Sequence, residues 1–504
     1  MDSTLPLSAR REIEAIVLAR PEVSQVSILD QEDPAGERYS IVYATASSAR
    51  PDPTQAQPSS SQQEGRVGQW KTIFNMTYRP QKEDKGPNFV GWRSSYTNKE
   101  IPSEEMQEWL DCAVERIESY APECVLEIGC GVGLLTQRLA PGRKAYTGTD
   151  FSGAAIRRLR EFVAVRPELR HVELSEREAT NFVGLPRESF DMAVINSVVQ
   201  YFPDLGYLET VLTRAADHII SGGRIFIGDV RHLGLLPAFH AGVQLAKAPS
   251  NAKVGWLRSK VSLMIDQERE LVIDPEFFRG LSHVIPRISG ADILVKRGQA
   301  RNEMNDYRYD VVLHVGEDSH VAAPEVSRWQ AETFEVDEIV SHLEAQKWDA
   351  VQIAGVPNLR VAKDVAAWRL LNSLDAQAPV ARIREQIDGL DTTGVDPETF
   401  WRLSDHGAYD VLVELPPRSR DGSFDVTVCR RHCRIGRPTE QQLAQEARAG
   451  APKATDPLAA AHKQQLAISL STLLRESLPA TQQPAAVLVV DQIPASANAL
   501  LSAR

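Results

Sequence analysis

The chain lacks the features that would place it in a membrane or outside the cell. No run of about eighteen apolar residues, the length that a membrane-spanning helix needs, occurs in its sequence. The N-terminus also lacks the basic, apolar and small-residue order of a signal peptide. We therefore expect a cytoplasmic protein that does not bind membranes.

Basic residues and cysteines are also sparse. The chain has 56 lysine and arginine residues against 68 aspartate and glutamate residues, and the resulting net charge of −12 disfavours nucleic acid as a partner. The five cysteines form no even framework. Cys429 and Cys433 are four residues apart, but no second pair accompanies them, so we expect no metal site.

The length and the local composition predict several domains. A chain of 504 residues can hold two or three domains. Residues 48–65 are rich in Pro, Ser and Gln and have too few apolar groups to fold, so they are predicted to form a linker. Residues 436–462, rich in Gln, Ala and Pro, are predicted to form a second linker. Residues 66–430, between the two linkers, are predicted to form the central domain, with a cap and a C-terminal extension.

The most informative pattern is a glycine-rich turn after a short apolar run. Residues 125–128 are mostly apolar, and Gly129, Gly131 and Gly133 follow at alternate positions. This pattern predicts a buried strand that turns sharply into a helix, with glycines where side chains would keep a ligand from the backbone. Asp150 closes the next apolar stretch, where a carboxylate can accept hydrogen bonds from ribose hydroxyls. A nucleoside cofactor is therefore predicted.

Glu127 distinguishes between nucleoside cofactors. It lies two residues before the first glycine, where its charge would repel a pyrophosphate, and the glycines lack G-x-G-x-x-G spacing. An acidic group there suits the positive sulfonium and the amino-acid tail of S-adenosylmethionine. We expect Tyr78, Phe151 and Asn196 to contact the same cofactor. Glu178 follows the predicted third strand, and it either binds the adenine amino group or is a solvated surface residue.

Further strand signals predict the fold class. Residues 190–196 form a predicted fourth strand, and a Ser-Gly-Gly turn at 221–223 precedes another strand at 224–229. Strand and helix signals alternate, which predicts an α/β fold with a doubly wound, mostly parallel sheet. Ligands bind at the carboxyl edge of such sheets. Strands at 308–315 and 409–415 are predicted to extend the sheet in the antiparallel direction.

Several stretches are longer than a generic cofactor motif requires. They are W-K-T-I-F-N-M-T-Y (70–78), G-W-R-S-S-Y-T (91–97), V-L-E-I-G-C-G-V-G (125–133), Y-T-G-T-D-F-S (146–152), I-N-S-V-V-Q-Y-F-P (195–203), G-D-V-R (228–231), A-F-H-A-G-V-Q-L (238–245) and Y-R-Y-D-V-V-L-H-V (307–315). With them, residues 70–316 resemble the methyltransferase domain that is inserted in adenylation domains of nonribosomal peptide synthetases. The resemblance implies a Rossmann-like class I methyltransferase that uses S-adenosyl-L-methionine to methylate an aminoacyl nitrogen.

The terminal segments resemble two halves of one lobe. Residues 1–47 resemble the start, and residues 463–504 the end, of the small C-terminal lobe of an adenylation domain. Each half is too short to bury a core alone, so we expect one α+β lobe made from both termini.

Two departures from the adenylation family limit what this lobe does. The family ends in Asn-Gly-Lys, with the lysine at the acyl-adenylate, whereas this chain has Asn498, Ala499 and Leu500, and leucine cannot donate a hydrogen bond. Arg10 and Arg11 stand where the hinge motif is expected. We expect neither a large adenylation lobe nor adenylation, and interpret the small lobe as a relic, a stabilising platform or a docking surface.

Three residues are candidates for the catalytic role. Asp229 ends a buried strand, Tyr201 follows Asn196 in a loop, and His240 lies on a helix that would cover the pocket. Such groups can orient an attacking amine and share its positive charge. The structural alternatives are a helix cap, a packing residue and a core histidine, respectively. Aromatic residues that either close over the cofactor or pack in the core are Trp70, Phe74, Tyr78, Trp92 and Tyr96.

Three functions remain open. The first is N-methylation of an amino acid, or of an aminoacyl group tethered to a carrier protein, in a nonribosomal pathway. The second is methylation of a free small molecule at an amino-acid nitrogen or a methionine thioether. The third is a non-catalytic scaffold that recruits a synthetase or its small accessory protein. The intact set of Glu127, the alternating glycines and Asp150 argues against the scaffold.

Overall fold

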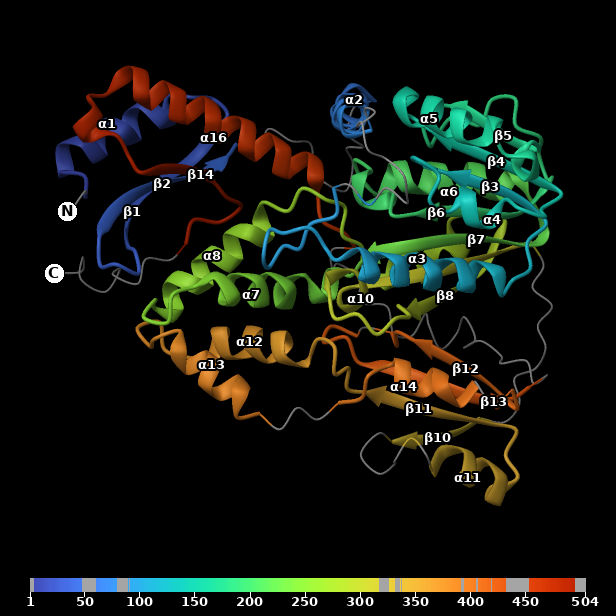
Figure 1. Cartoon of the computed structure of the whole chain (residues 1–504). Coiled ribbons are helices and arrows are strands. Elements are labelled where there is room, and N and C mark those ends of the chain that lie inside the picture. The colour runs from blue at the N-terminus through green and yellow to red at the C-terminus, as the bar shows by residue number, and fades with distance from the viewer. Residues whose placement is uncertain are drawn as a thin grey trace.

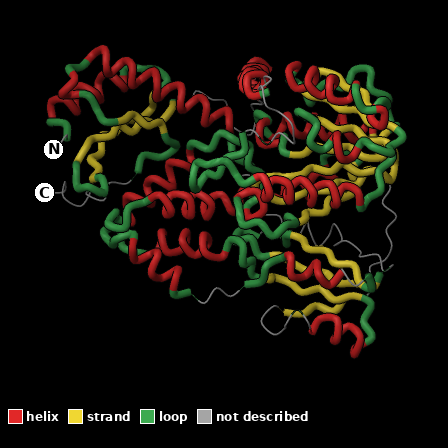
Figure 2. Tube along the Cα trace, viewed as in Figure 1, coloured by secondary structure: helices red, strands yellow, loops and turns green. Residues whose placement is uncertain are grey.

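The described chain forms a large sheet flanked by helices, a C-terminal extension and a small lobe (Figure 1). Helices lie on both sides of the large sheet (Figure 2). The computed structural model describes residues 4–47, 60–78, 89, 91–316, 326–330, 336, 338–390, 394–404, 407–417, 419–431 and 453–494.

The central strands are arranged as a doubly wound sheet. Neighbouring strands from β5 to β7 run parallel, whereas β9 lies antiparallel between β7 and β8. The predicted mostly parallel α/β fold is confirmed, and the predicted strand at 308–315 is antiparallel as expected. The order is β5 (Val172–Glu176), β4 (Ala145–Asp150), β3 (Cys124–Ile128), β6 (Phe190–Asn196), β7 (Ile219–Arg231), β9 (Arg308–Val315) and β8 (Ile288–Val295).

Alternate residues of the central strands face opposite helical layers. In β3, Val125 packs in a cluster with residues of α3 (Ser103–Glu118) and α5 (Gly153–Ala164). The next residue, Leu126, packs with residues of α6 (Leu205–His218) on the other face. Because strand side chains alternate between faces, this packing buries both faces of the sheet and leaves its carboxyl edge for the loops.

More helices pack beside this sheet. α7 and α8 follow β7, and they share a buried apolar cluster with α12 and α13 from the C-terminal extension. This cluster holds the four helices together as one layer at the side of the sheet (Figure 1). Their bounds, with those of three short helices, are α4 (Thr136–Leu139), α7 (Leu236–Lys247), α8 (Val254–Asp266), α9 (Pro275–Arg279), α10 (Glu303–Asp306), α12 (Ala362–Ser373) and α13 (Ala381–Asp388).

The C-terminal extension forms strands that meet the central sheet at one residue pair. β12 and β8 are antiparallel and are joined at Glu414 and Leu294. The predicted strand at 409–415 is therefore an antiparallel neighbour of the central sheet. The order in the extension is β10 (Val326–Gln330), β11 (Ala350–Val356), β13 (Phe424–Arg430) and β12 (Tyr409–Glu414), with α11 (Glu338–Gln346) and α14 (Glu398–Trp401) beside them.

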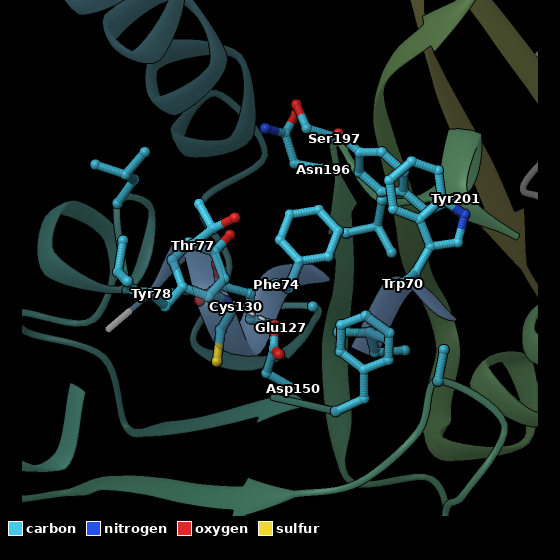
Figure 3. A pocket seen from close by; sticks show the side chains of 18 of the residues that line it. Trp70, Phe74, Thr77, Tyr78, Glu127, Cys130, Asp150, Asn196, Ser197 and Tyr201 are labelled. Atoms are coloured by element: carbon cyan, nitrogen blue, oxygen red, sulfur yellow. Dashed lines mark hydrogen bonds between the residues drawn. The ribbon is translucent and has the colours of Figure 1, made fainter. Parts of the chain in front are cut away.

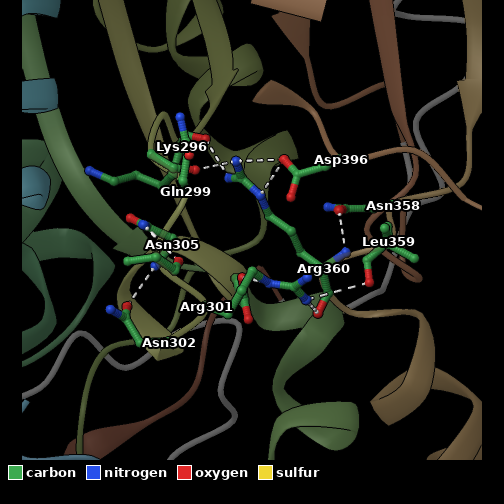
Figure 4. Close-up of polar contacts among 12 residues, drawn as sticks. Lys296, Gln299, Arg301, Asn302, Asn305, Asn358, Leu359, Arg360 and Asp396 are labelled. Atoms are coloured by element: carbon green, nitrogen blue, oxygen red, sulfur yellow. Dashed lines mark hydrogen bonds and ion pairs between the residues drawn. The ribbon is translucent and has the colours of Figure 1, made fainter. Parts of the chain in front are cut away.

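A buried arginine joins the extension to the segment after β8. The Arg360 guanidinium donates to the carbonyl oxygens of Lys296 (2.7 Å) and Gly298 (2.6 Å) and pairs with Asp396 (3.0 Å) (Figure 4). Its side chain is only 1% exposed. Because a buried guanidinium is costly unless its donors are satisfied, these partners fix the position of the extension.

The terminal segments meet in a small separate sheet. β2 pairs antiparallel with β1 and parallel with β14, which comes from the other end of the chain. Ile13, Val42 and Leu470 belong to one buried cluster, so helices from both ends cover this sheet. The elements are α1 (Leu7–Leu18), β1 (Val23–Glu32), β2 (Arg38–Ala46), α16 (Pro457–Ser477) and β14 (Ala486–Val489).

Some boundaries differ from the sequence prediction. α2 (Ser60–Thr77) begins inside the predicted linker 48–65, and α16 begins inside the predicted linker 436–462. A tertiary contact supports the first turns of α2, because the Gln63 amide donates to Asp204 (2.9 Å). Composition of a short segment carries no signal of such a distant partner.

The predicted turn at 221–223 lies inside β7. Pairing with β6 begins at Ile219, is interrupted, and resumes at Arg224, so the glycines form a bulge. Cys433 of the candidate cysteine pair and residues 497–500 lie outside the described residues. Of the helices in the described part of the chain, none combines the length and apolarity that a bilayer crossing needs.

Candidate functional site

A cavity of about 320 Å³ lies at the carboxyl ends of β3, β4 and β6. The turn after β3, the end of β4 and the loop after β6 line it, and side chains of α2 face them (Figure 3). The structure brings many of the predicted site residues together here. Those that line this first cavity are Tyr78, Glu127, Gly129, Gly131, Asp150, Phe151, Asn196 and Tyr201.

The glycine turn brings bare backbone to this cavity. Gly131 has φ +52°, and a Cβ there would lie 3.4 Å from the Tyr78 hydroxyl. A side chain would therefore narrow the space above the turn. Gly133 serves packing instead, since its Cβ would lie 2.3 Å from a methyl carbon of Leu159. Of the predicted glycines, Gly129 and Gly131 line the cavity.

The Asp150 carboxylate is held by backbone donors. Its Oδ2 accepts from the amide of Gly131 (2.9 Å), and its Oδ1 accepts from the amide of Ser152 (2.7 Å). Each oxygen keeps a second lone pair, so the carboxylate can still accept hydrogen bonds from ribose hydroxyls. Burial raises the pKa of Asp150 from 3.8 to about 6, although these two amides oppose the shift.

Glu127 is the second buried acid of the cavity. Its Oε2 accepts hydrogen bonds from the hydroxyls of Thr136 (2.5 Å) and Tyr146 (2.7 Å). Burial raises the pKa of Glu127 from 4.5 to about 7 despite these bonds, and the Asp150 charge adds to the rise. Because a bound cation stabilises the ionised form of such acids, the pair favours a positively charged ligand.

Aromatic rings form the opposite wall. Phe74 lies 5.6 Å from Tyr78, 6.0 Å from Phe151 and 5.0 Å from Tyr201, measured between ring centroids. Trp70 lies 4.6 Å from Tyr201. Ring faces attract cations, so this wall suits a sulfonium as well as an adenine ring.

A second cavity, of about 570 Å³, adjoins the first. Trp70, Trp92 and Tyr201 line both cavities, so Tyr201 lies at their junction. The predicted catalytic residue His240 lines the second cavity, where its Nε2 is 3.4 Å from Glu268. The structure therefore places His240 in a different cavity from Asp150.

Asp229 is fully buried between charged partners. Its carboxylate accepts from Ser197 Oγ (2.7 Å) and Trp109 Nε1 (3.2 Å), and it pairs with Arg308 (2.5 Å) and Lys296 (3.8 Å). Ser197 and Trp109 line the first cavity, whereas Asp229 is not among the described residues that line either one. The structure thus places Asp229 where it holds residues of the cavity wall.

Two other predicted residues line neither cavity. Glu178 is exposed, and its neighbours Arg177 and Ala179 line the first cavity in its place. The Tyr96 hydroxyl donates to Asp364 (2.7 Å) and lies 3.0 Å from the hydroxyl of Tyr307. Tyr96 therefore joins a polar cluster with α12.

Sequence reasoning missed the acidic residues of the second cavity. Glu268 and Glu270 both pair with Arg231, at 3.0 Å and 2.9 Å. Arg231 belongs to a stretch already singled out, but the Glu-Arg-Glu segment at 268–270 has no spacing typical of a site. The one sequence feature that could have indicated them is that two acidic residues lie close in sequence to the predicted helix that carries His240.

Comparisons with known proteins agree with this geometry. Residues 126–225 match a family model described as a methyltransferase domain. A chondramide synthase from Chondromyces crocatus is 35% identical over 98% of this chain and 13% of its own length. A probable non-canonical nonribosomal peptide synthetase from Salinispora arenicola is 33% identical over 98% of this chain and 6% of its own length. The chain thus spans a small part of the curated relatives it matches.

Among solved structures, the N-methyltransferase NodS from Bradyrhizobium japonicum is similar at a TM-score of 0.30 and 15% identity, over 49% of this chain and 98% of that one. The fold assignment rests on the strand order given above, because this similarity is weak. The matched model at 126–225 includes the glycine turn, Asp150 and β6. The predicted enzyme class, a methyltransferase, is confirmed at the level of the domain. The chain carries a methyltransferase domain and is related over nearly its whole length to parts of nonribosomal peptide synthetases.

Proposed function

We propose that this chain methylates the nitrogen of an amino acid, free or held as an aminoacyl group on a carrier protein, in nonribosomal peptide biosynthesis. One observation carries the proposal: the glycine turn, Glu127 and Asp150 line one cavity, and a larger cavity adjoins it. The names of the relatives, which are peptide synthetases, support the biosynthetic setting. A cytoplasmic location stays a prediction.

The residues of the first cavity fit the methyl donor. Bare backbone at Gly131 leaves room above the turn, and Asp150 has lone pairs for ribose hydroxyls. Glu127 and the aromatic wall suit the positive charge. When bound, S-adenosylmethionine supplies an electrophilic methyl carbon. Asp150, Glu127 and the glycine turn then bind and orient it.

Positioning is the main task of the chain in this reaction. An α-amino group whose neighbouring carboxyl is acylated, as in a peptide or an aminoacyl thioester, has a pKa of about 7.7 to 8.0, so its deprotonation at neutral pH costs only about 1 kcal/mol. A strong base is therefore not required. Holding the amine and the methyl carbon about 3 Å apart and in line supplies most of the acceleration. Two adjoining cavities that share Tyr201 support this part of the proposal.

Transfer of a labelled methyl group tests the proposal. Three acceptors are compared: free amino acids, amino acids loaded on a carrier protein, and N-acetylmethionine, which offers a thioether but no amine. We expect label on nitrogen in one or both of the first two arms. Label only on the thioether would contradict the proposal, as would no transfer in any arm by protein that binds S-adenosylmethionine in a calorimeter.

A further inference from the structure

The second cavity has both an apolar wall and a charged wall. The apolar residues come from the segment after β7, from α7 and α8 and from further segments, and the charged residues include Arg231 of β7 and the segment 268–270 after α8. A ligand with an apolar body and a polar head group fits such a cavity. The apolar residues include Leu235, Leu236, Phe239, Met264, Val272 and Tyr307.

The two carboxylates of the charged wall are not equivalent. Glu268 is largely satisfied, because its Oε1 accepts from the amides of Arg269 (3.0 Å) and Glu270 (3.1 Å) and its Oε2 pairs with Arg231 (3.0 Å). Glu270 uses only Oε2, which accepts from Arg231 (2.9 Å). Within the described residues, Oε1 of Glu270 makes no hydrogen bond, and its side chain is 30% exposed.

The charges of this group attract an amine. Two carboxylates share the single guanidinium of Arg231, so the trio of Arg231, Glu268 and Glu270 carries one net negative charge, while Arg93 and Arg269 also line the cavity. Arg308, on the same cavity, is already paired with the buried Asp229 (2.5 Å). An ammonium group or a polarised amine is therefore the ligand that Glu270 favours.

The backbone places Glu270, which lines the second cavity, near the junction of the two cavities. The amide of Leu271 donates to the carbonyl oxygen of Gln200 (2.8 Å), which ties this segment to the loop that carries Tyr201. Burial raises the pKa of Tyr201, and the Glu270 charge adds to the rise, as expected for close neighbours. Tyr201 in turn lines the cavity of the methyl donor.

We propose that the second cavity binds the amino group of an amino acid with an apolar side chain, and that Oε1 of Glu270 accepts a hydrogen bond from that amine. This inference rests on the proposed function and names the acceptor site for it. The nitrogen lone pair forms the C–N bond as the C–S bond breaks, and sulfur keeps the electron pair of that bond. One proton leaves the product ammonium, and Glu270 stabilises this cation before the proton reaches solvent.

The cavity also bears on the source of the amino acid. Arg93 and Arg269 line it, and the carboxylate of a free amino acid would have these cations as partners. A thioester has no such charge. The test therefore compares free leucine with the N-acetylcysteamine thioester of leucine.

Direct binding of these two probes tests the inference without turnover. Protein saturated with S-adenosylhomocysteine is titrated with each probe by calorimetry, and initial rates with S-adenosylmethionine give kcat and KM. In Glu270→Gln we expect at least tenfold weaker binding of the better probe and at least tenfold lower kcat/KM. The affinity for S-adenosylhomocysteine should change less than twofold, and Arg231 keeps its partner Glu268 in this variant.

Glu276→Gln is the matched control. Glu276 pairs with Arg279 at 2.6 Å with exposures of 33% and 12%, close to the 30% and 14% of Glu270 and Arg231. Glu276 is not among the residues that line either cavity. We expect this control to behave as the unchanged protein in every measurement.

The outcomes separate the inference from the proposed function. Probe binding that depends on Glu270, without methyl transfer to nitrogen, would support the acceptor site and contradict the proposed function. Methyl transfer to nitrogen that is the same in Glu270→Gln and in the control would overturn the inference alone. Absence of probe binding by the unchanged protein would also overturn it.

Discussion

The two adjoining cavities differ in how the chain builds them. The first is lined largely by short turns that each follow one strand of the central sheet, with α2 as its cover. The second collects residues from segments near 91–101, 231–240, 264–272 and 303–308. A binding site made of consecutive turns leaves a pattern in the sequence, whereas a site made of distant segments leaves almost none. The binding of the methyl donor is therefore easier to infer from the sequence than that of the acceptor.

Substitution of the buried Arg360, which joins the C-terminal extension to the segment after β8, should have the largest effect. Arg360→Ala removes the donors to Lys296 and Gly298 and leaves Asp396 without its partner. We expect a loss of about 3 kcal/mol in the free energy of unfolding, measured by urea denaturation. The segment that Arg360 holds leads to α10, whose Glu303 and Met304 line the second cavity, so ligand binding there should weaken more than ligand binding in the first cavity, measured by calorimetry.

Arg369→Ala is the control for that substitution. Arg369 belongs to the same extension, but its side chain is 68% exposed and pairs with an Asp421 that is 45% exposed. An exposed ion pair contributes about 0 to 1 kcal/mol, so this variant should be nearly as stable as the unchanged protein. An equal loss of unfolding free energy in Arg360→Ala and Arg369→Ala would contradict the structural role given to Arg360.

Asp150→Ala tests the first cavity. Loss of the carboxylate that we expect to bind the ribose should weaken the affinity for S-adenosylmethionine about tenfold or more, measured by calorimetry. Glu178→Ala is the comparison, because Glu178 is exposed beside the cavity and should leave the affinity unchanged. If Glu178→Ala weakened binding and Asp150→Ala did not, the adenosine would not lie where we place it.

The pH dependence of donor binding tests Glu127. Burial raises its pKa to about 7, and a cation bound nearby favours its ionised form. The affinity for S-adenosylmethionine should therefore rise severalfold between about pH 6 and about pH 8, with proton release on binding. Calorimetry in buffers of different ionisation enthalpy measures that release. The rise should be smaller in Glu127→Gln, and the same pH profile in both proteins would contradict this assignment.

In the ligand-free protein, the free energy of unfolding should fall as the pH rises. Because the folded-state pKa of Glu127 lies above its ordinary value of 4.5, its protonated form stabilises the folded state at low pH. This contribution is lost as the pH rises through about 7. Asp150, with a pKa raised to about 6, acts in the same direction.

Residues at or just after the carboxyl end of a strand could be placed from the sequence. Glu127, the glycine turn and Asp150 line one cavity because parallel strands end at the same edge of a sheet. Asp229 also ends the predicted strand, yet its partner Arg308 is 79 positions away in the chain. Such a distant partner neutralises the carboxylate inside the protein, and local sequence carries no sign of it.

The residues of the acceptor cavity were even harder to predict from the sequence. Glu270 lies in a segment after α8 that is tied to the loop after β6 by a backbone hydrogen bond between Leu271 and Gln200. Backbone bonds of this kind are independent of side-chain identity, so residue type does not reveal them. His240 could be predicted to cover a pocket, but which pocket it covers depends on how α7 packs on its neighbours.

A crystal structure with S-adenosylhomocysteine and a leucine thioester analogue tests the central claim most directly. We predict the ribose hydroxyls within hydrogen-bond distance of Asp150, and the amine beside Glu270 across Tyr201. Adenosine bound outside the first cavity, or both ligands in the same cavity, would contradict the account.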